Sequence, residues 1–353
     1  MAKVNSRQLD KAAVKYSGAA AALMASLSNE RKAFRFDSVD TASAFMAKEL
    51  EYVKSKSYDK LYPQFTALSI FPVNSDANPG ANSITFYTYD MEGLAKIVDN
   101  YSTDLPRADA NGTPHSVPVK TLGVSYGYSN QEMRASRMSG KSLDSRKAES
   151  ARFQIDNATN KIAWAGDAKN GLLGVLSDGQ NIPVKTLTAG GTSGKVSWTE
   201  KTADEIIADV TAMYAQVTST TRDVERPDTL VLPTEVYTAL SLKRLGDTEA
   251  TVLEYVQKHA PYLKEIVSAS ELNSNNPETN PYAEGAPGVG SNEGQAVAFL
   301  FTNSPDKLEI NIPMAFTQNP AQPRNLETII PCESRVAGVI MFYPLSALIV
   351  VGV

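Results

Sequence analysis

The chain has 353 residues, of which 42% are hydrophobic and 21% are charged, and its formal net charge is −5. This length and composition are those of a globular protein with a sizeable core and two domains. The single cysteine, Cys332, excludes a disulfide within the chain and is typical of a protein made in a reducing compartment.

Charge is unevenly distributed along the chain. Residues 1–60 hold eleven Lys and Arg against seven Asp and Glu, a local charge of +4 that leaves −9 for the remainder. A mildly basic N-terminal arm on an acidic body can contact nucleic acid or an acidic partner, although such a run is more often a solvated face. The first residues lack the apolar segment of a signal peptide, so we expect a soluble protein made in the cytosol.

Helical patterns come first in chain order. Residues 1–35 contain an alanine-rich helical pattern with little apolar bulk, which predicts an arm that leans on another surface. Residues 41–54 predict a second helix. The run FTALSIFPV, residues 65–73, then predicts a strand, and NPGAN, residues 78–82, predicts a turn.

A β-hairpin is predicted next. Its strands are ITFYTYD, residues 84–90, and LAKIV, residues 94–98, separated by a short turn. Alternation along the first strand places Tyr87 and Tyr89 on one side and Phe86 on the other. The hairpin is too long, and too polar at its far end, to pack wholly on its own domain.

The segment from Ser142 to Gly166 predicts one long helix, preceded by a strand at residues 119–129. Ser142 is a good N-cap residue, and Gly166 ends the pattern. At 1.5 Å per residue the helix is roughly 35 Å long. Its narrow stripe predicts that it lies flat on a surface, namely the sheet built from residues 303–353. The stripe steps by three and four and is mostly alanine: Ala148, Ala151, Ile155, Ala158, Ile162 and Ala165.

Helices and strands alternate after this helix. The sequence TADE at residues 202–205 predicts a capping box that opens a helix. The loop at residues 273–294 is rich in Pro, Gly and Asn and is predicted to be exposed. The C-terminal run VAGVIMFYPLSALIVVGV contains Pro344 and predicts two buried strands around a turn, not a membrane span. The elements between are a strand DTLVLP, a helix from Pro233, a helix over residues 250–259, and strands in LKEIVSASEL and AVAFLFT.

No constellation of residues points to chemistry. The two histidines, His115 and His259, lie far apart and have no cysteine or acidic neighbours at ligand spacing. Gly140-Lys141-Ser142 ends like a phosphate-binding loop, but Ala135 stands where that loop needs a glycine. We therefore predict no catalytic, cofactor-binding or metal-binding residue, and a structural or assembly protein rather than an enzyme.

The order of these elements resembles the major capsid protein of tailed bacteriophages, whose α+β fold is shared with encapsulins and with the capsid floor of herpesviruses. The order is an N-terminal arm, an extended hairpin, one long helix, an α/β domain and returning strands. Three segments carry the similarity: VPVKTLGVSYGYSNQEMRAS before the long helix, GDAKNGLLGVL after it, and KLEINIPMAFTQNPAQP with the strands that follow.

The resemblance implies a role for each segment. The axial domain clusters around five-fold and six-fold axes, and the extended loop lies over the adjacent subunit. The implied segments are an N-terminal arm at residues 1–40, a peripheral domain at 41–170 with an extended loop at about 83–106 and a spine helix at about 142–165, an axial domain at 171–302 with Gly246–Ala250 facing the axis, and C-terminal strands at 303–353 that return to the peripheral domain.

The implied function is that of a self-assembling virion protein. Pentamers and hexamers of the chain form an icosahedral shell, which matures from a procapsid and contacts its packaged double-stranded DNA non-specifically. Scaffold, portal and decoration proteins are the further partners expected, and no cofactor or membrane is involved. The protein is expected in the virion, and in the host cytoplasm during assembly. An encapsulin-like compartment is the alternative, and a soluble α/β enzyme is a second one.

Two features of some relatives do not transfer to this sequence. Some cross-link a lysine of the extended loop to an asparagine of another subunit. Lys96 is the only lysine in the hairpin, but no motif aligns it with Asn311, Asn319 or Asn325, so we do not expect cross-linking. The roughly forty residues before the body are too few for a full scaffolding segment, which leaves a separate scaffold protein or a short cleaved piece open.

Overall fold

The structure is a computed structural model that describes residues 62–97, 107–140, 144–246, 249–260, 262–283 and 294–353. The chain divides into two units, Met1–Leu61 and Tyr62–Val353. The helices predicted within residues 1–35 and 41–54 lie outside the described residues. The described residues all belong to the second unit.

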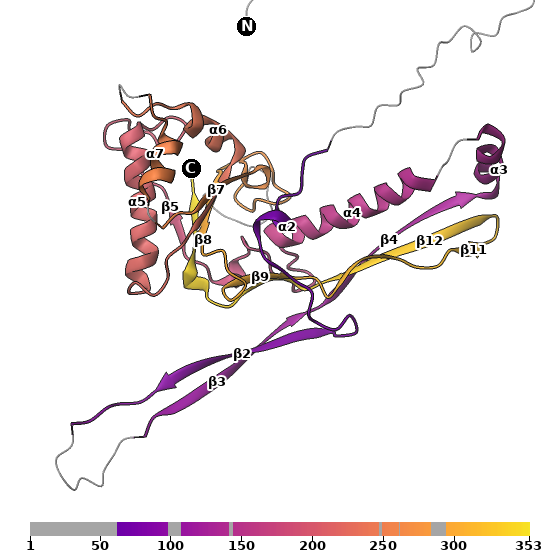
Figure 1. The fold of residues 1–353 in the computed structure, drawn as a ribbon, viewed down its shortest axis with the longest axis horizontal. Helices are drawn as coiled ribbons and strands as arrows, with labels where there is room; N and C mark the ends of the chain where they lie inside the picture. The colour runs from indigo at the N-terminus through magenta and orange to yellow at the C-terminus, as the bar shows by residue number, and fades with distance from the viewer. Residues whose placement is uncertain (1–61, 98–106, 141–143, 247–248, 261, 284–293) are drawn as a thin grey trace, which may run out of the picture. The chain divides into compact units, whose positions relative to one another are not determined.

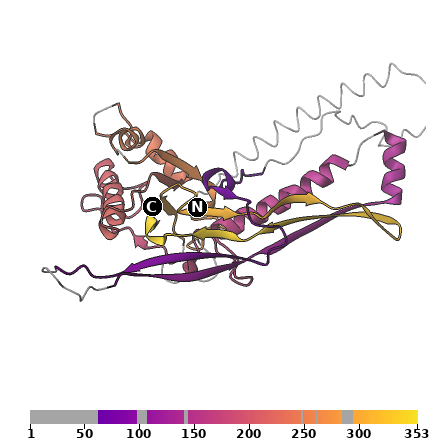
Figure 2. The ribbon, with the colours of Figure 1, turned by 60° about the horizontal axis from the view of Figure 1, so that its bottom comes forward.

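The long helix is present as α4, Asp144–Trp164, and lies along one face of a sheet (Figures 1 and 2). Its Ala151 and Ile155 are buried against Cys332 of strand β12, Glu327–Val336. The prediction that its alanine-rich stripe rests on strands from the C-terminal segment is therefore confirmed. Gly166 follows the helix in the left-handed region, with φ of 77°. Ser142 lies outside the described residues.

The sheet beneath α4 is centred on β12. Strand β4, Lys120–Ser129, pairs with β12 in antiparallel register over its whole length. The even-numbered residues of β4 face the helix, because Leu122, Val124 and Tyr126 pack against its buried side chains. The odd-numbered residues, on the opposite face, are all Thr, Gly or Ser. The other side of β12 pairs with β10, Met314–Gln318, and β11, Gln322–Arg324.

A short helix that the sequence analysis missed connects β4 to the spine. This helix, α3, spans Asn130–Ser139 and begins with a capping box in which Ser129 and Glu132 bond each other's backbone N–H groups. None of its residues is buried. Because the hydrophobic pattern reports burial, a helix without a buried face leaves little signal in the sequence.

The hairpin is real, but its second strand was predicted wrongly. Strand β2, Ser83–Glu92, pairs with β3, Asp109–Pro118, so residues 94–97 of the predicted second strand lie outside the ladder. Polar residues form β3 because the cross-strand pairs support them: the Tyr89 ring covers Gly112, and Phe86 stacks on His115. Strand β3 passes directly into β4 through the buried residue Val119.

The strand predicted over residues 65–73 is also wrong in its first half. Ala67–Ile70 is a helical turn, α2, whose first N–H groups are held by side chains distant in the sequence. Only β1, Val73–Asn74, is extended, and it pairs in parallel with β9, Leu308–Asn311. Strand β13, Gly338–Met341, completes this small sheet. Tertiary contacts thus override the local strand preference.

A five-stranded sheet forms the second half of the unit. The helices on one face are α5, Ala203–Thr220, α6, Thr234–Leu242, and α7, Val252–His259, and their apolar residues form one core with the sheet. The capping box predicted at Thr202 and Glu205 is confirmed. The opposite face packs around Trp164, at the end of α4. The strand order is β5 (Val184–Thr186), β14 (Ala347–Val351), β8 (Val297–Phe301), β6 (Thr229–Pro233) and β7 (Glu265–Ala269).

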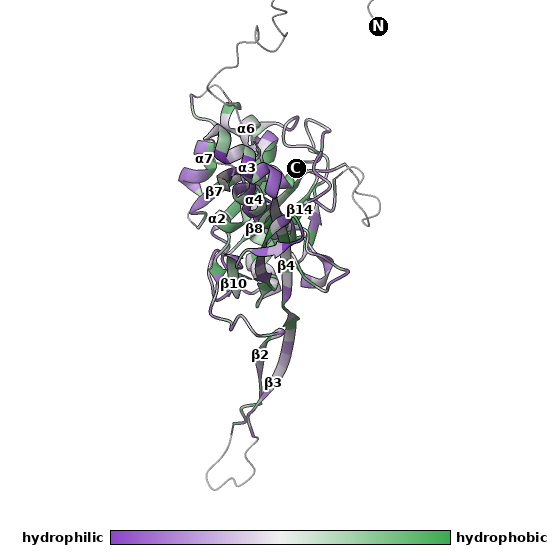
Figure 3. Cartoon of the chain, turned by 90° about the vertical axis from the view of Figure 1, so that its right-hand side faces the viewer, coloured by the Kyte–Doolittle hydropathy of each residue, from purple (hydrophilic) through white to green (hydrophobic). Residues whose placement is uncertain are grey.

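The C-terminal run folds as two buried strands, β13 and β14, joined through a 3₁₀ turn at Pro344–Ser346, as predicted. The position of β14 differs from the expectation, because this strand pairs with β5 and β8 rather than with the sheet under α4. Two further 3₁₀ turns span Asp178–Gln180 and Ser270–Leu272. No helix in the described part of the chain is long and apolar enough to cross a membrane. Figure 3 shows the apolar colouring of β8 and β14 against the more polar hairpin.

Candidate assembly interface

The hairpin formed by β2 and β3 presents large apolar side chains to solvent. Tyr87 and Tyr89 stack on one another with ring centroids 6.5 Å apart, which confirms that they share one side of the hairpin. Their exposed fractions are 60% and 72%, and that of Met91 is 88%. In the connection beyond β2, Leu94 and Ile97 are almost fully exposed. Contiguous exposed apolar surface of this kind marks a protein–protein interaction site.

The opposite side of the hairpin holds its base to the body. Phe86 packs edge-on against Phe342, with ring centroids 4.9 Å apart, and stacks on His115 at 5.2 Å. Thr88 Oγ1 lies 3.0 Å from His115 Nε2. Arg335 of β12 donates to the Pro79 carbonyl just before β2. The base of the hairpin therefore has a defined orientation relative to the body. A cavity of about 340 Å³ lies between the two.

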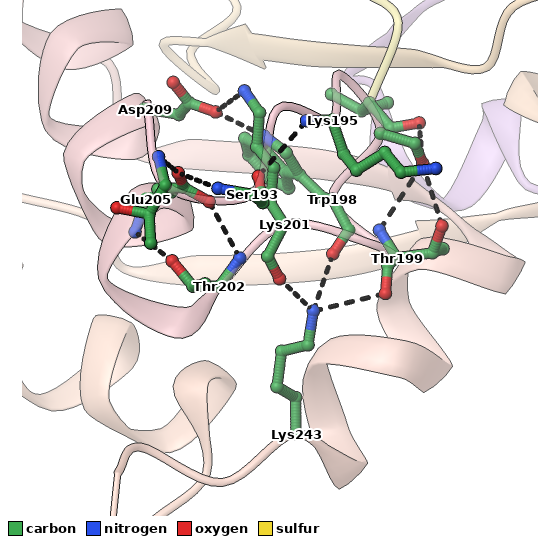
Figure 4. Close-up of polar contacts among 12 residues, drawn as sticks. Ser193, Lys195, Trp198, Thr199, Lys201, Thr202, Glu205, Asp209 and Lys243 are labelled. Atoms are coloured by element: carbon green, nitrogen blue, oxygen red, sulfur yellow. Dashed lines mark hydrogen bonds and ion pairs between the residues drawn. The ribbon is translucent and has the colours of Figure 1, made fainter. Parts of the chain in front are cut away.

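A polar cluster fixes the turn that precedes α5 (Figure 4). The Lys201 side chain is 1% exposed and pairs with Asp209 at 2.6 Å, and Asp209 also accepts a bond from the Trp198 indole. Lys243, at the end of α6, donates to three carbonyl oxygens, those of Trp198, Thr199 and Lys201, at 2.5 to 3.2 Å. Burial lowers the pKa of Lys243. The cluster joins the end of α6 to the turn before α5.

Glu205 closes the same cluster from the first turn of α5. Its carboxylate accepts backbone N–H groups from Ser193 and Thr192 at 3.0 and 2.8 Å, and from Thr202 at 3.0 Å. These bonds, that from Ser193 foremost, hold the pKa of Glu205 far below its usual range. The structural role of Glu205 therefore depends on its charge.

Glu205→Gln is expected to lower the Tm at neutral pH by an amount that shrinks in acid. Since the folded pKa is lowered, the stabilisation is complete above the unfolded pKa, about 4.3, and is lost as the pH falls toward the folded value. Thermal unfolding of both proteins from pH 7 to pH 3 measures this. Glu200→Gln, in an exposed pair with Lys195, is the control. A Tm difference independent of pH would contradict the expectation.

The residues considered for chemistry are not brought together. His115 lies in the hairpin, and His259 stacks on Tyr255 at the end of α7. Within the described ranges no group of three or more His, Cys, Asp or Glu residues is placed to hold a metal ion. Asn311 and Asn319, considered for cross-linking, bond to Glu309 and Glu333 of their own chain. Cys332 is buried, and burial raises the pKa of its thiol.

The Lys243 cluster was missed by the sequence analysis, because a lysine that binds main-chain carbonyls has no motif. The hairpin was predicted too short, because its second strand, β3, is polar and depends on its pairs with β2. Its tyrosines, by contrast, were identified from strand alternation alone.

Comparison with known proteins assigns the chain to a family. A family model described as major capsid protein matches residues 93–353. No curated protein matches the chain.

Solved structures show the same fold. A chain from the capsid of Myoviridae phage XM1 superposes with a TM-score of 0.71 at 17% identity, over 89% of this chain and 100% of that one. A chain of Mycobacterium phage Bobi gives a TM-score of 0.57 at 14% identity, over 87% and 98% of the two chains. The capsid of a native GTA particle gives 0.57 at 14% identity, over 89% and 99%. The chain therefore belongs to the major capsid protein family and is a structural protein of a phage capsid shell.

Proposed function

We propose that the chain assembles into pentamers and hexamers that close an icosahedral shell around double-stranded DNA. The observation that carries the proposal is the exposed apolar side of the hairpin, which needs a neighbouring subunit to cover it. Each contact between subunits is modest, but many repeated contacts add up once a shell closes.

In this proposal the segments take the roles expected from the sequence. The extended loop, expected at about residues 83–106 and continued here to Pro118 because β3 is its second strand, lies over an adjacent subunit. Helix α4 is the spine of the peripheral domain. The five-stranded sheet with α5, α6 and α7 is the axial domain, with Gly246–Ala250 toward the axis. Residues 1–40 act as an arm to a neighbour. Strand β14, which pairs with β5 and β8, belongs with the axial sheet rather than with the returning strands.

The contents and helpers of the shell belong to the same proposal. The net charge of −5 suits a container that contacts DNA non-specifically, because a strongly basic surface would bind the phosphates tightly. Scaffold, portal and decoration proteins are the further partners, the host cytoplasm is the place of assembly, and no enzymatic activity is assigned. The rival is an encapsulin-like compartment that encloses protein.

Tyr87→Ala combined with Tyr89→Ala is expected to raise the concentration needed for assembly by about 30-fold or more. Two buried tyrosines at an interface contribute about 2 kcal/mol or more per contact, and every contact in the shell repeats the loss. Negative-stain imaging and sedimentation measure shells against free subunits. The matched control is Val224→Ala, which removes an equally exposed apolar side chain away from the hairpin.

The contents of purified shells decide between the two kinds of container. Nuclease-protected DNA in particles of the expressed protein supports the phage shell, and a protein cargo without DNA supports the rival. A wild-type chain that stays a stable monomer, even when its helper proteins are supplied, would contradict self-assembly.

A further inference from the structure

Strand β2 has an open edge. The Val119 N–H bonds to the Asn82 carbonyl at 2.9 Å, so this pair belongs to the hydrogen-bonded set of the β2–β3 ladder. Bonded and non-bonded pairs alternate in an antiparallel ladder, so the even-numbered residues of β2 bond to β3. The odd-numbered residues point their N–H and C=O groups outward, and these groups have no hydrogen-bond partner among the described residues. They are Ser83, Thr85, Tyr87, Tyr89 and Met91.

The outer edge of β3 is closed by comparison. By the same alternation its outward positions are the even-numbered ones, which include Pro114 and Pro118. Proline has no N–H to donate, and natural sheets use it to protect an edge strand from further pairing. One edge of the hairpin is thus protected and the other is open.

Strand β4 has a second open edge. The Asn130 N–H bonds to the Leu326 carbonyl at 2.9 Å, which assigns the even-numbered residues of β4 to the ladder with β12. The outward carbonyl of Gly127 accepts Lys147 Nζ at 2.9 Å, in agreement with that alternation. The outward groups of Thr121, Gly123 and Ser125 have no hydrogen-bond partner in the part of the chain that the structure describes. All three residues are exposed.

These two edges cannot pair within one chain. Strand β3 continues into β4 through Val119. The hairpin therefore extends from one end of this continuous strand, and β12 lies beside the other end (Figures 1 and 2). A second copy is therefore needed to bring an open β2 edge to an open β4 edge. Such a contact joins different surfaces of the two copies, and it can repeat around a ring.

The side chains at the two edges are complementary in size. Residues with outward backbone groups share one face of their strand, so Tyr87 and Tyr89 accompany the open edge of β2, and small residues accompany that of β4. An aromatic ring beside a strand glycine covers the backbone that the glycine exposes. The hairpin already contains one example, because a Cβ on Gly112 would meet the Tyr89 ring at 2.9 Å. Around Gly123 the space is free, with no atom within 4 Å of a Cβ position.

We propose that β2 of one copy adds as a strand to the open edge of β4 in a neighbouring copy, with Tyr87 and Tyr89 over Thr121, Gly123 and Ser125. The result is one continuous sheet that runs from β3 of the first copy to β12 of the second. Backbone hydrogen bonds supply the attraction, and the tyrosines set the register. This inference rests on the proposed self-assembly and names the partner surface of the hairpin.

Hydrogen exchange of the wild-type protein tests the proposal without any substitution. On assembly, the amides of Tyr87, Tyr89 and Gly123 are expected to exchange at least ten-fold more slowly than in free subunits. The outward amides of Gly112 and Ser116 on the protected β3 edge are the matched control and are expected to keep their rate. Protection of β4 without β2 would mean that another segment occupies β4, and would overturn the proposal.

Cysteine cross-linking tests the same contact directly. A chain carrying Tyr87→Cys and Gly123→Cys is expected to form disulfide-linked oligomers in assembled shells, at least ten-fold more than a chain carrying Ser116→Cys and Gly123→Cys. The native Cys332 is buried and does not compete. Shells that form with no excess over the control pair, together with unchanged amide exchange, would overturn the strand addition and leave self-assembly standing. Absence of shells from the wild-type chain would instead refute the proposed function itself.

Discussion

Replacing Gly174 with alanine is expected to destabilise the fold by about 3 kcal/mol or more, because overpacking against rigid backbone cannot relax cheaply. A Cβ on this residue would lie 2.4 Å from the Gly166 nitrogen and 2.6 and 2.7 Å from the carbonyl oxygens of Trp164 and Ile162. The close approach exists because residues 174–177 close the C-terminal end of α4.

The last carbonyls of α4 depend on this segment. The Val175 and Leu176 N–H groups bond to the carbonyls of Ala163 and Trp164 at 2.8 and 2.9 Å. Ser177 Oγ donates to the Ala165 carbonyl at 2.8 Å. Carbonyls at the end of a helix have no partner within the helix, so displacement of this segment leaves buried acceptors without hydrogen bonds.

Urea and thermal unfolding of Gly174→Ala measure the effect. Gly191→Ala is the matched control, because a Cβ there meets no atom within 4 Å, and it is expected to change the free energy of unfolding by less than about 0.5 kcal/mol. Equal stabilities for the two variants would show that the backbone contact between α4 and residues 174–177 is not maintained in solution.

Glu271→Ala is expected to have the second large effect, a loss of about 3 kcal/mol in the free energy of unfolding. Glu271 is 3% exposed, and its carboxylate accepts hydrogen bonds from the Thr66 N–H and hydroxyl and from the Asn160 side chain, at 2.8 to 3.0 Å. Asn160 in turn accepts the Ala67 N–H at 3.1 Å. Alanine leaves the buried Asn160 donor and the partly buried Thr66 donors without an acceptor, and a buried polar group without a partner is costly.

The contacts also predict where the damage appears. Because Glu271 holds the start of α2 against α4, its loss should expose residues 62–71 first, and limited proteolysis should cleave there before global unfolding. Glu271→Gln keeps one acceptor and should lie between alanine and wild type. The control is Glu278→Ala, which breaks an exposed pair with Lys161 and should cost less than about 1 kcal/mol. A control as harmful as Glu271→Ala would refute the argument.

Elements whose stability is local were predictable from the sequence. Helix α4 carries its own periodicity, and α5 carries its own capping box at Thr202 and Glu205. The alternation of β2 correctly separated its tyrosines from Phe86. In each case the physical cause lies within a few residues of its effect.

Elements decided by distant contacts were not predictable. The residues of α2 read as a strand, and they turn because Glu271 and Asn160, far along the chain, hold their N–H groups. Strand β3 is polar and is extended because β2 provides partners for it. The Lys243 cluster depends on three carbonyl oxygens, which every residue type possesses, so residue identity gives no signal of it.

The position of β14 has a consequence for the order of folding. This strand lies between β5 and β8, and β5 pairs with no other strand of the sheet. A growing chain therefore carries an unpaired β5 and a bare edge of β8 until residues 347–351 emerge from the ribosome. Pairing over such long sequence separations is slow, and open edges in the waiting chain favour aggregation. The five-stranded sheet is complete only after synthesis has passed this strand, so the chain's own topology prolongs the time during which these edges can associate prematurely.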